Sequence, residues 1–321
     1  MTEDKKLLSS FQLITRYCKI EAPYWRYFLE HYKSLGISLF HICVQTEDDL
    51  DDFNNQFKGL CTNHIIHKLD SNLTPDVAMK NFNFKLINPD LKYTIFLDSD
   101  EFFNFTGNIN DLNECIDKFT QIRIPWVMNI LENIYDDKCQ GYYGHTGKPI
   151  SLTSQITSLH GDHAFKLRGF RKKVEHLIGK RSEHRIPLLI NAILIHYWSR
   201  GIKDVILRTI FSRFKSFKQS DQSQFFEIIK SGSLPNRLKM MAFLSIQKNY
   251  LFFESKFFSN YYDAEIENQL LRSDGISEIL VDDIQENYFN YKEQLIKNNN
   301  FPRYPSISIL FSSNKCIVIP A

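Results

Sequence analysis

The sequence predicts an α/β protein: a mostly parallel sheet flanked by helices, with a helical C-terminal extension. Three observations favour this class. Short apolar runs alternate with helical patterns in the first part of the chain, and after Lys203 the pattern becomes mostly helical. Hydrophobic residues make up 43% and charged residues 24% of the 321 residues, as in ordinary globular proteins. This composition excludes a wholly disordered or fibrous chain.

The N-terminal part contains four predicted strands separated by helices. The strand patterns are Phe11–Tyr17, Leu39–Val44, His64–Leu69 and Tyr93–Leu97. Helical patterns lie between them, at Tyr24–Ser34, at Leu50–Gly59 and within Asn72–Asn88. Gly36 is expected to end the first helix and Pro89 to follow the third. Strands that alternate with helices in this way form right-handed βαβ units, so we expect a mostly parallel sheet.

The second half has a different pattern. Two more strands are predicted, at Gln121–Val127 and Leu188–Tyr197. The following segments have helical spacing: Val205–Phe217, Phe225–Ile229, Arg237–Phe253, Glu265–Leu271 and Ile276–Leu295. Phe301–Ala321 contains one last apolar run, which the pattern does not assign. We therefore expect an α/β domain over residues 1–200 and a mostly helical extension over residues 201–321.

Charge and targeting signals narrow the class of protein. Lys and Arg number 39 against 37 Asp and Glu, a formal net charge of +2, which disfavours a nucleic-acid binder. No apolar run approaches the ~20 residues that a bilayer requires. The N-terminus lacks a signal-peptide pattern, and the six cysteines form no CxxC pair. We expect a cytoplasmic protein with reduced thiols and no zinc site.

Three acids follow the fourth predicted strand: Asp98, Asp100 and Glu101. Open α/β sheets bind ligands at the carboxyl ends of their strands, where loops and helix N-termini meet. Strand side chains alternate between faces, so a bend is needed to aim Asp98 and Asp100 at one point. Carboxylate oxygens suit a hard divalent cation, which can neutralise a leaving diphosphate. The acids therefore suggest a cation site for phosphate chemistry.

Two other interpretations of these acids were considered. Acids after a strand are often helix caps or solvated turn residues, and a bare Asp-x-Asp pattern is common. An EF-hand calcium loop is excluded, because the glycine needed at its sixth position is Phe103 and the acid needed at its twelfth is Ile109.

Three stretches give the chain a family resemblance. Residues 16–37 include Glu21, Trp25 and His31 ahead of Leu-Gly; residues 97–103 read Leu-Asp-Ser-Asp-Glu-Phe-Phe; and residues 195–200 read Ile-His-Tyr-Trp-Ser-Arg. In order and separation they resemble nucleotide-sugar glycosyltransferases of the GT-A fold, in the family-2-like branch that includes family-92-type enzymes. The sequence departs from that pattern at Ile20, in the order of Ser199 and Arg200, and at the Gln45–Asp49 strand exit.

The resemblance implies roles for several residues. Glu21 would line the nucleotide pocket, although an acid that starts a helix is an equal interpretation. Asp48 or Asp49 would contact the base or ribose, unless the pair is a solvated turn. Asp98 would lie on the ribose side and also bind the metal, and Asp100 would bind the metal. His196 would be the third ligand, against the alternative of a core histidine bonded to backbone.

Basic stretches and further acids complete the candidates. Lys166–Arg185 and Arg200–Lys218 would hold the donor diphosphate, with Arg200 as a contact, or an anionic acceptor. They would otherwise face an anionic membrane surface or form a solvated helix face. An inverting reaction needs a carboxylate base near the acceptor hydroxyl. The candidates are Asp162, Glu183, Asp136 and Asp137.

The sequence thus predicts a glycosyltransferase that depends on Mn2+ or Mg2+. It would move a sugar from a UDP- or GDP-sugar to a hydroxyl of a glycan, polysaccharide or lipid-linked acceptor, with possible peripheral membrane contact. A nucleotidyltransferase of related fold is the first alternative, but Arg16–Ala22 lacks the glycines of a phosphate loop. A non-catalytic protein with this fold is the second, and the retained acids at 98, 100 and 101 argue against it.

Overall fold

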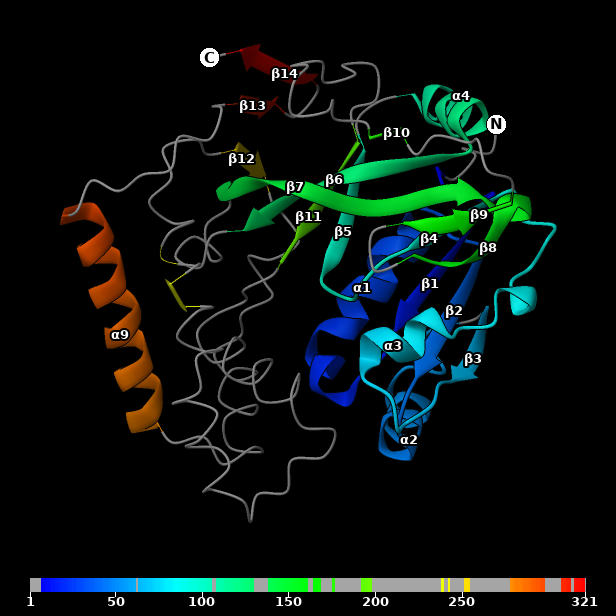
Figure 1. Cartoon of the computed structure of the whole chain (residues 1–321), viewed down its shortest axis with the longest axis horizontal. Coiled ribbons are helices and arrows are strands. Elements are labelled where there is room, and N and C mark those ends of the chain that lie inside the picture. The colour runs from blue at the N-terminus through cyan, green and yellow to red at the C-terminus, as the bar shows by residue number, and fades with distance from the viewer. Residues whose placement is uncertain are drawn as a thin grey trace. The chain divides into compact units, whose positions relative to one another are not determined.

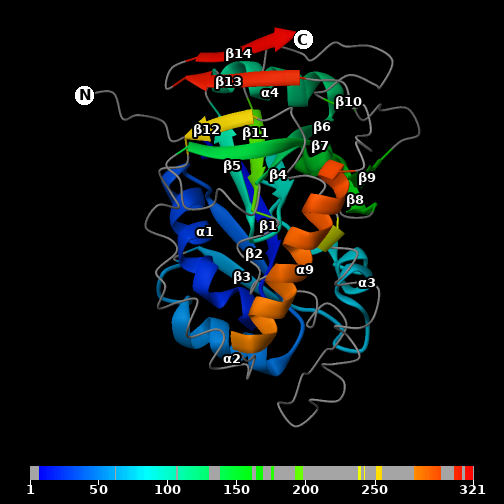
Figure 2. The same ribbon diagram turned by 90° about the vertical axis from the view of Figure 1, so that its left-hand side faces the viewer.

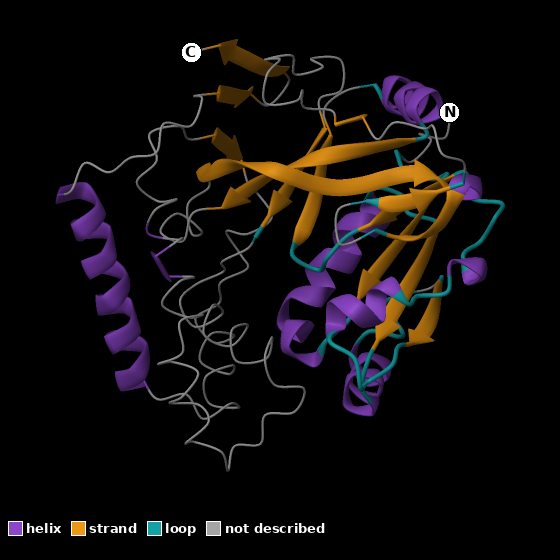
Figure 3. Cartoon of the chain, in the orientation of Figure 1, coloured by secondary structure: helices purple, strands orange, loops and turns teal. Residues whose placement is uncertain are grey.

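The structure, a computed structural model, describes residues 7–61, 63–105, 108–129, 138–160, 164–168, 175–176, 192–197, 238–239, 242, 251–254, 278–297, 307–312 and 315–320. The chain divides into two compact units. The first comprises Met1–Trp126 and Gly144–His196, and the second comprises Val127–Tyr143 and Tyr197–Ala321. Figure 3 shows helices and strands alternating along the first unit. In the described part of the chain, no helix is long and apolar enough to span a bilayer.

The first unit begins with alternating strands and helices. Its elements up to the fourth strand are, in chain order, β1 (Phe11–Arg16), η1 (Lys19–Glu21), α1 (Ala22–Ser34), β2 (Leu39–Val44), α2 (Glu47–Gln56), β3 (His64–Lys68), α3 (Pro75–Lys80), η2 (Phe84–Leu86) and β4 (Tyr93–Phe96). These match the four strands predicted from the apolar runs. The helices between them are also present, with shifted ends.

The rest of the first unit is richer in strands. It contains β5 (Glu101–Phe105), α4 (Ile109–Phe119), β6 (Gln121–Asn129), β7 (Lys138–Leu152), η4 (Thr153–Gln155), β8 (Ile156–Leu159), β9 (Phe165–Leu167), β10 (Glu175–His176) and β11 (Ala192–His196). Strands β6 and β7 continue into the second unit. β6 and β11 correspond to predicted strands. Sequence patterns did not identify β5, α4 or β7.

The central sheet has the order β3-β2-β1-β4-β7. β1 pairs in parallel with β2 and with β4, and β2 pairs in parallel with β3. β7 pairs antiparallel to β4. The sheet is therefore mostly parallel, as predicted, and the carboxyl ends of β1 to β4 share one edge (Figure 1).

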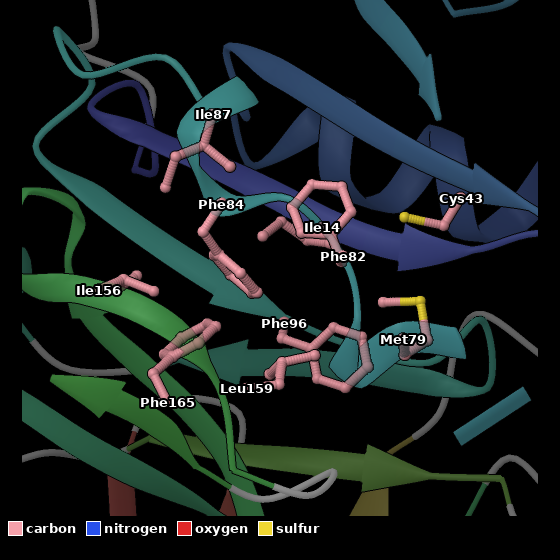
Figure 4. Packing of buried hydrophobic residues seen from close by; sticks show 10 residues of the cluster. All are labelled: Ile14, Cys43, Met79, Phe82, Phe84, Ile87, Phe96, Ile156, Leu159 and Phe165. Atoms are coloured by element: carbon pink, nitrogen blue, oxygen red, sulfur yellow. The ribbon is translucent and has the colours of Figure 1, made fainter. Parts of the chain in front are cut away.

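Helices cover both faces of this sheet. In Figure 2, α1 and α3 lie on opposite sides of β1, β2 and β3. Figure 4 shows the apolar cluster on the α3 side, where Ile14, Cys43 and Phe96 from three strands meet side chains from α3, η2, β8 and β9. On the other face, Tyr17 packs edge-on against Trp25 of α1 and Phe53 of α2. Both faces of the sheet are thus buried by large aromatic side chains.

Local signals explain the helix ends. Gly36 has φ 90°, and the amides of Gly36 and Ile37 donate to the carbonyls of Lys33 and Tyr32, a Schellman ending of α1. α2 begins at Glu47, three residues before the predicted start, because Thr46 Oγ1 accepts from the amide of Asp49 at 3.0 Å. The predicted helix within Asn72–Asn88 is shorter than its pattern.

The second unit has both helix and strands in its described residues. They are β12 (Leu251–Glu254), α9 (Glu278–Lys297), β13 (Ile307–Ser312) and β14 (Lys315–Pro320). α9 confirms the helix predicted at Ile276–Leu295. The predicted helix Arg237–Phe253 is wrong at its end, where residues 251–254 pair antiparallel with β7. The other predicted helices at 205–217, 225–229 and 265–271 lie outside the described residues.

The apolar tail forms strands. β13 pairs antiparallel with β14 over Ile307–Ser312 and in parallel with β12 at Leu310. The run Phe301–Ala321, which the sequence pattern left unassigned, therefore contributes two strands to the second unit. β-branched residues in both strands and Phe311 in β13 suit this conformation.

Candidate functional site

The acids that follow β4 lie in a tight turn. The amide of Glu101 donates to the carbonyl of Asp98 at 3.1 Å, and the amide of Asp98 donates to Glu101 Oε2 at 2.8 Å. This turn is the bend that the alternating strand geometry required. Asp98 keeps a side-chain exposure of 38%, whereas Asp100 and Glu101 are buried. Asp98 is thus the accessible acid of the three.

Lys148 of β7 lies beside two of these acids. Its Nζ is 2.5 Å from Asp98 Oδ2 and 3.6 Å from Glu101 Oε1. The Lys148 side chain is 1% exposed, and its ammonium lies over the ring of Phe96, 4.6 Å from the centroid. No sequence pattern predicts Lys148 as a site residue. The available signal was a lysine at the start of the apolar segment Pro149–Leu152, in a strand whose partner could not be deduced.

His196 lies beside Asp100. β11 pairs antiparallel with β5, and this register sets His196 opposite Glu101. His196 Nε2 is 3.2 Å from Asp100 Oδ2, and its ring centroid is 4.5 Å from that of Trp126. The imidazole is buried, but its Nε2 faces a carboxylate, not a backbone carbonyl. The geometry therefore differs from the alternative of a histidine bonded to backbone in the core.

Glu21 follows the carboxyl end of β1 and contacts the turn after β4. It is the N-cap residue of α1, yet its side chain makes no capping hydrogen bond. Glu21 Oε2 instead accepts from Ser99 Oγ at 3.4 Å. The exits of β1 and β4 are thus joined through Glu21 and Ser99. Glu21 therefore contacts the turn after β4, and its role in a nucleotide pocket stays a prediction.

The charges around the turn shift the pKa values of two acids in opposite directions. Burial alone would raise the pKa of Asp98, but the ammonium of Lys148 outweighs this effect and the pKa is lowered. For Glu101, burial is the largest cause and raises the pKa well above its usual range. The charges of Asp98 and Asp100 raise it further against the opposing effect of Lys148. Asp98 is therefore held ionised, and Glu101 favours its protonated form.

The two acids after β2 differ in their surroundings. Asp49 is buried: Oδ2 accepts from Thr46 Oγ1 at 2.7 Å, and Oδ1 accepts from the amide of Lys19 at 2.8 Å. Asp49 thus fixes the start of α2 to the exit of β1. Asp48 is exposed in the first turn of α2. Of the two, Asp48 is the one open to a ligand.

Several predicted residues lie outside the described residues. They are the diphosphate contact Arg200, the base candidates Asp162 and Glu183, and the further options Asp136 and Asp137. Most of Lys166–Arg185 and all of Arg200–Lys218 also lie outside. Their roles remain predictions.

We tested whether the three predicted metal ligands fit a divalent cation. Two ligands that bind one ion at about 2.1 Å and at right angles lie ~3 Å apart. The 3.2 Å between Asp100 Oδ2 and His196 Nε2 matches this separation. The third predicted ligand, Asp98, has its Oδ2 paired with Lys148. Among the residues that the structure describes, no three His, Cys, Asp or Glu side chains converge as a metal site.

Comparisons with known proteins give only distant similarities. No protein-family model and no curated protein sequence matches the chain. Among solved structures, Staphylococcus aureus TarS residues 1–349 share 12% identity at a TM-score of 0.26, with 95% of each chain covered. The same fragment in complex with UDP-GlcNAc shares 13% identity at a TM-score of 0.25.

A second group of similar structures covers less of the chain. The 4-diphosphocytidyl-2C-methyl-D-erythritol synthase of Anaerococcus prevotii shares 9% identity at a TM-score of 0.29, over 44% of this chain and 71% of its own. Mannose-1-phosphate geranyltransferase of Thermus thermophilus shares 11% identity at a TM-score of 0.27, over 44% of this chain and 57% of its own. TM-scores this low assign no function to the chain.

Proposed function

We propose that this protein is a metal-dependent glycosyltransferase that moves a sugar from a nucleoside-diphosphate sugar to a hydroxyl acceptor. One observation carries the proposal: the turn after β4 brings Asp98 and Asp100 to the carboxyl edge of a parallel sheet, where Glu21 and His196 also lie. This edge is where open α/β sheets bind nucleotides. The similarity of three motifs to GT-A-fold enzymes agrees with this location.

The donor nucleotide would bind along the exits of β1, β2 and β4. Asp98 is exposed and held ionised, which suits an acceptor of hydrogen bonds from ribose hydroxyls. Glu21 would line the same pocket through its contact with Ser99. Asp48 would lie at the edge near the base.

A divalent cation, Mn2+ or Mg2+, would bind at Asp100 and His196. Their 3.2 Å separation suits two ligands of one ion, and donor phosphate oxygens or a carboxylate would complete the coordination. When bound, the cation would stabilise the negative charge of the leaving diphosphate. The protein would contribute by aligning the acceptor oxygen with the anomeric carbon. Asp162 or Glu183 would accept the hydroxyl proton if the anomeric centre inverts.

A donor screen tests the proposal. Purified protein with Mn2+ is incubated with a panel of UDP- and GDP-sugars and hydroxyl acceptors, and released nucleoside diphosphate is measured. We expect release with at least one donor and its loss in EDTA. Pyrophosphate release from a nucleoside triphosphate and a sugar phosphate would instead identify a nucleotidyltransferase. Failure to release or bind any nucleotide would contradict both enzymes.

A further inference from the structure

Lys148 is a buried cation with two acidic neighbours. Its side chain is 1% exposed, and its Nζ contacts Asp98 Oδ2 at 2.5 Å and approaches Glu101 Oε1 to 3.6 Å. The first distance is that of a short, charge-assisted hydrogen bond. The strand pairing explains the contact, because β7 runs antiparallel beside β4, whose exit carries both acids.

Burial of an ammonium group normally costs several kcal/mol unless charges and hydrogen bonds compensate for lost water. The surroundings of Lys148 supply that compensation. In addition to the carboxylate of Asp98, the faces of Phe96 and Trp126 lie 4.6 and 5.9 Å from Nζ to the ring centroids, within or near the range of cation–π attraction. Phe96 itself belongs to the apolar cluster of the sheet (Figure 4). The ammonium of Lys148 therefore packs against a side chain of the core.

We propose that Lys148 is the internal counter-ion of the candidate site and a positioning residue for Asp98. This inference rests on the proposed function. The ammonium occupies the position beside Asp98 Oδ2 that an exchangeable cation would otherwise take. It therefore limits the site to one exchangeable cation, bound at Asp100 and His196, and keeps Asp98 for the donor nucleotide.

This arrangement separates the roles of the two aspartates. Asp98 pairs with the fixed charge of Lys148, yet 38% of its side chain is exposed, so it can contact a donor while one oxygen is held. Asp100 is 2% exposed and faces the imidazole of His196. A simple pair of equivalent metal-binding acids would not place a buried lysine against one of them.

Direct measurement of Mn2+ binding tests the inference without any turnover. The wild type is compared with Lys148→Met, which removes the charge, and Lys148→Arg, which keeps it. Lys92→Met is the matched control, because Lys92 pairs with Asp117 at 2.7 Å but is 53% exposed. We expect Lys148→Met to bind Mn2+ at least about tenfold more tightly than the wild type, since repulsion is removed and Asp98 Oδ2 is freed. Lys148→Arg and Lys92→Met should bind as the wild type does.

A second variant covers a loss of folding in Lys148→Met. The double variant Glu101→Gln, Lys148→Met removes one buried acid together with the ammonium, and the same increase in Mn2+ affinity is expected. Equal or weaker Mn2+ binding by the folded variants, or no binding by any protein, would overturn the inference. Nucleotide titrations distinguish this failure from that of the proposed function: a wild type that binds no nucleoside diphosphate contradicts the function, whatever the Mn2+ results show.

Discussion

Two buried polar clusters in the first unit differ in charge and in hydrogen bonding. The first is the candidate site at the strand exits, with Asp98, Asp100, Glu101, Lys148 and His196. The second lies within the sheet and connects neutral groups: Gln12 donates to Thr94 Oγ1 at 3.1 Å, and its Oε1 lies 2.8 Å from His41 Nε2. We call this second cluster the sheet network.

The sheet network has the features of a structural element. Gln12 and His41 are fully buried, and His41 Nδ1 lies 2.9 Å from His67 Nε2. Gln12 also exchanges hydrogen bonds with the backbone of Asn88, as donor at 2.8 Å and acceptor at 2.9 Å. Neutral groups that satisfy one another in this way stabilise a unique fold.

The candidate site concentrates charge at an edge where one carboxylate stays exposed. Its groups are also buried, but they are ionic, and Asp98 remains open to solvent. Burial of polar groups alone therefore does not distinguish function from structure here. Charge, exposure at a strand exit and the separation of potential ligands do so. Substitutions should accordingly change stability in the sheet network and binding or turnover in the site.

The largest expected effect is acid destabilisation through buried histidines. Burial lowers the pKa of His41 and the pKa of His31 to about 4 each. The charge of neighbouring His67 also lowers the pKa of His41. In the unfolded chain these histidines bind protons near pH 6.5, but in the folded chain they do so only near pH 4. The free energy of unfolding therefore falls as the pH decreases from 6.5 toward 4. We expect a loss of ~4 kcal/mol between pH 7 and 5, at about 1.4 kcal/mol per unit for each histidine.

Urea unfolding at several pH values measures this loss. His41→Leu should lower the stability at pH 7 but reduce its dependence on pH, because one protonation step has been removed. An unchanged pH dependence in this variant would show that His41 is not the group that titrates.

The second effect concerns catalysis at Asp100. Asn has nearly the shape of Asp but lacks its charge, so Asp100→Asn should bind the cation less tightly and stabilise the leaving diphosphate less. We expect about a hundredfold loss of turnover, ~2.7 kcal/mol, with little change in stability. Asp90→Asn, at an exposed position, is the matched control for initial-rate measurements. Wild-type turnover in Asp100→Asn would show that the acids form only a turn.

The third effect tests the sheet network at Gln12. Gln12→Ala removes five contacts, with Asn88, Thr94, Thr153 and His41, and leaves buried polar groups without partners. We expect the free energy of unfolding to fall by ~2 kcal/mol while nucleotide affinity stays constant. Gln56→Ala, which removes only an exposed hydrogen bond to Asp52, should change neither quantity. Loss of nucleotide binding by folded Gln12→Ala would contradict the division between the clusters.

The sequence predicted the central sheet because its signals are local. Leu39–Val44 is apolar except for His41, and Gly36 supplies the positive φ that ends α1. The missed elements depend on tertiary pairing. Residues 251–254 have helical spacing but lie as a strand against β7, so tertiary strand pairing outweighs a weak local preference.

The candidate site divides in the same way. Asp98 and Asp100 are visible in sequence because both follow one apolar strand within three residues. Lys148 is separated from Asp98 by 50 positions and contacts it only because β7 pairs with β4. No periodicity marks such a residue. Thr46 is visible in sequence as a cap three residues before Asp49, whereas the bond of Asp49 to the Lys19 amide depends on the fold.

Metal dependence of nucleotide binding tests the central claim most directly. The carboxylate of Asp100 and a diphosphate repel one another unless a cation lies between them. UDP or GDP affinity, measured by calorimetry with the full chain, is compared in Mn2+ and in EDTA. The account predicts at least about a tenfold weaker affinity in EDTA, ~1.4 kcal/mol. Equal affinity in both conditions would contradict the assignment of Asp98 and Asp100 to a metal-dependent nucleotide-sugar site.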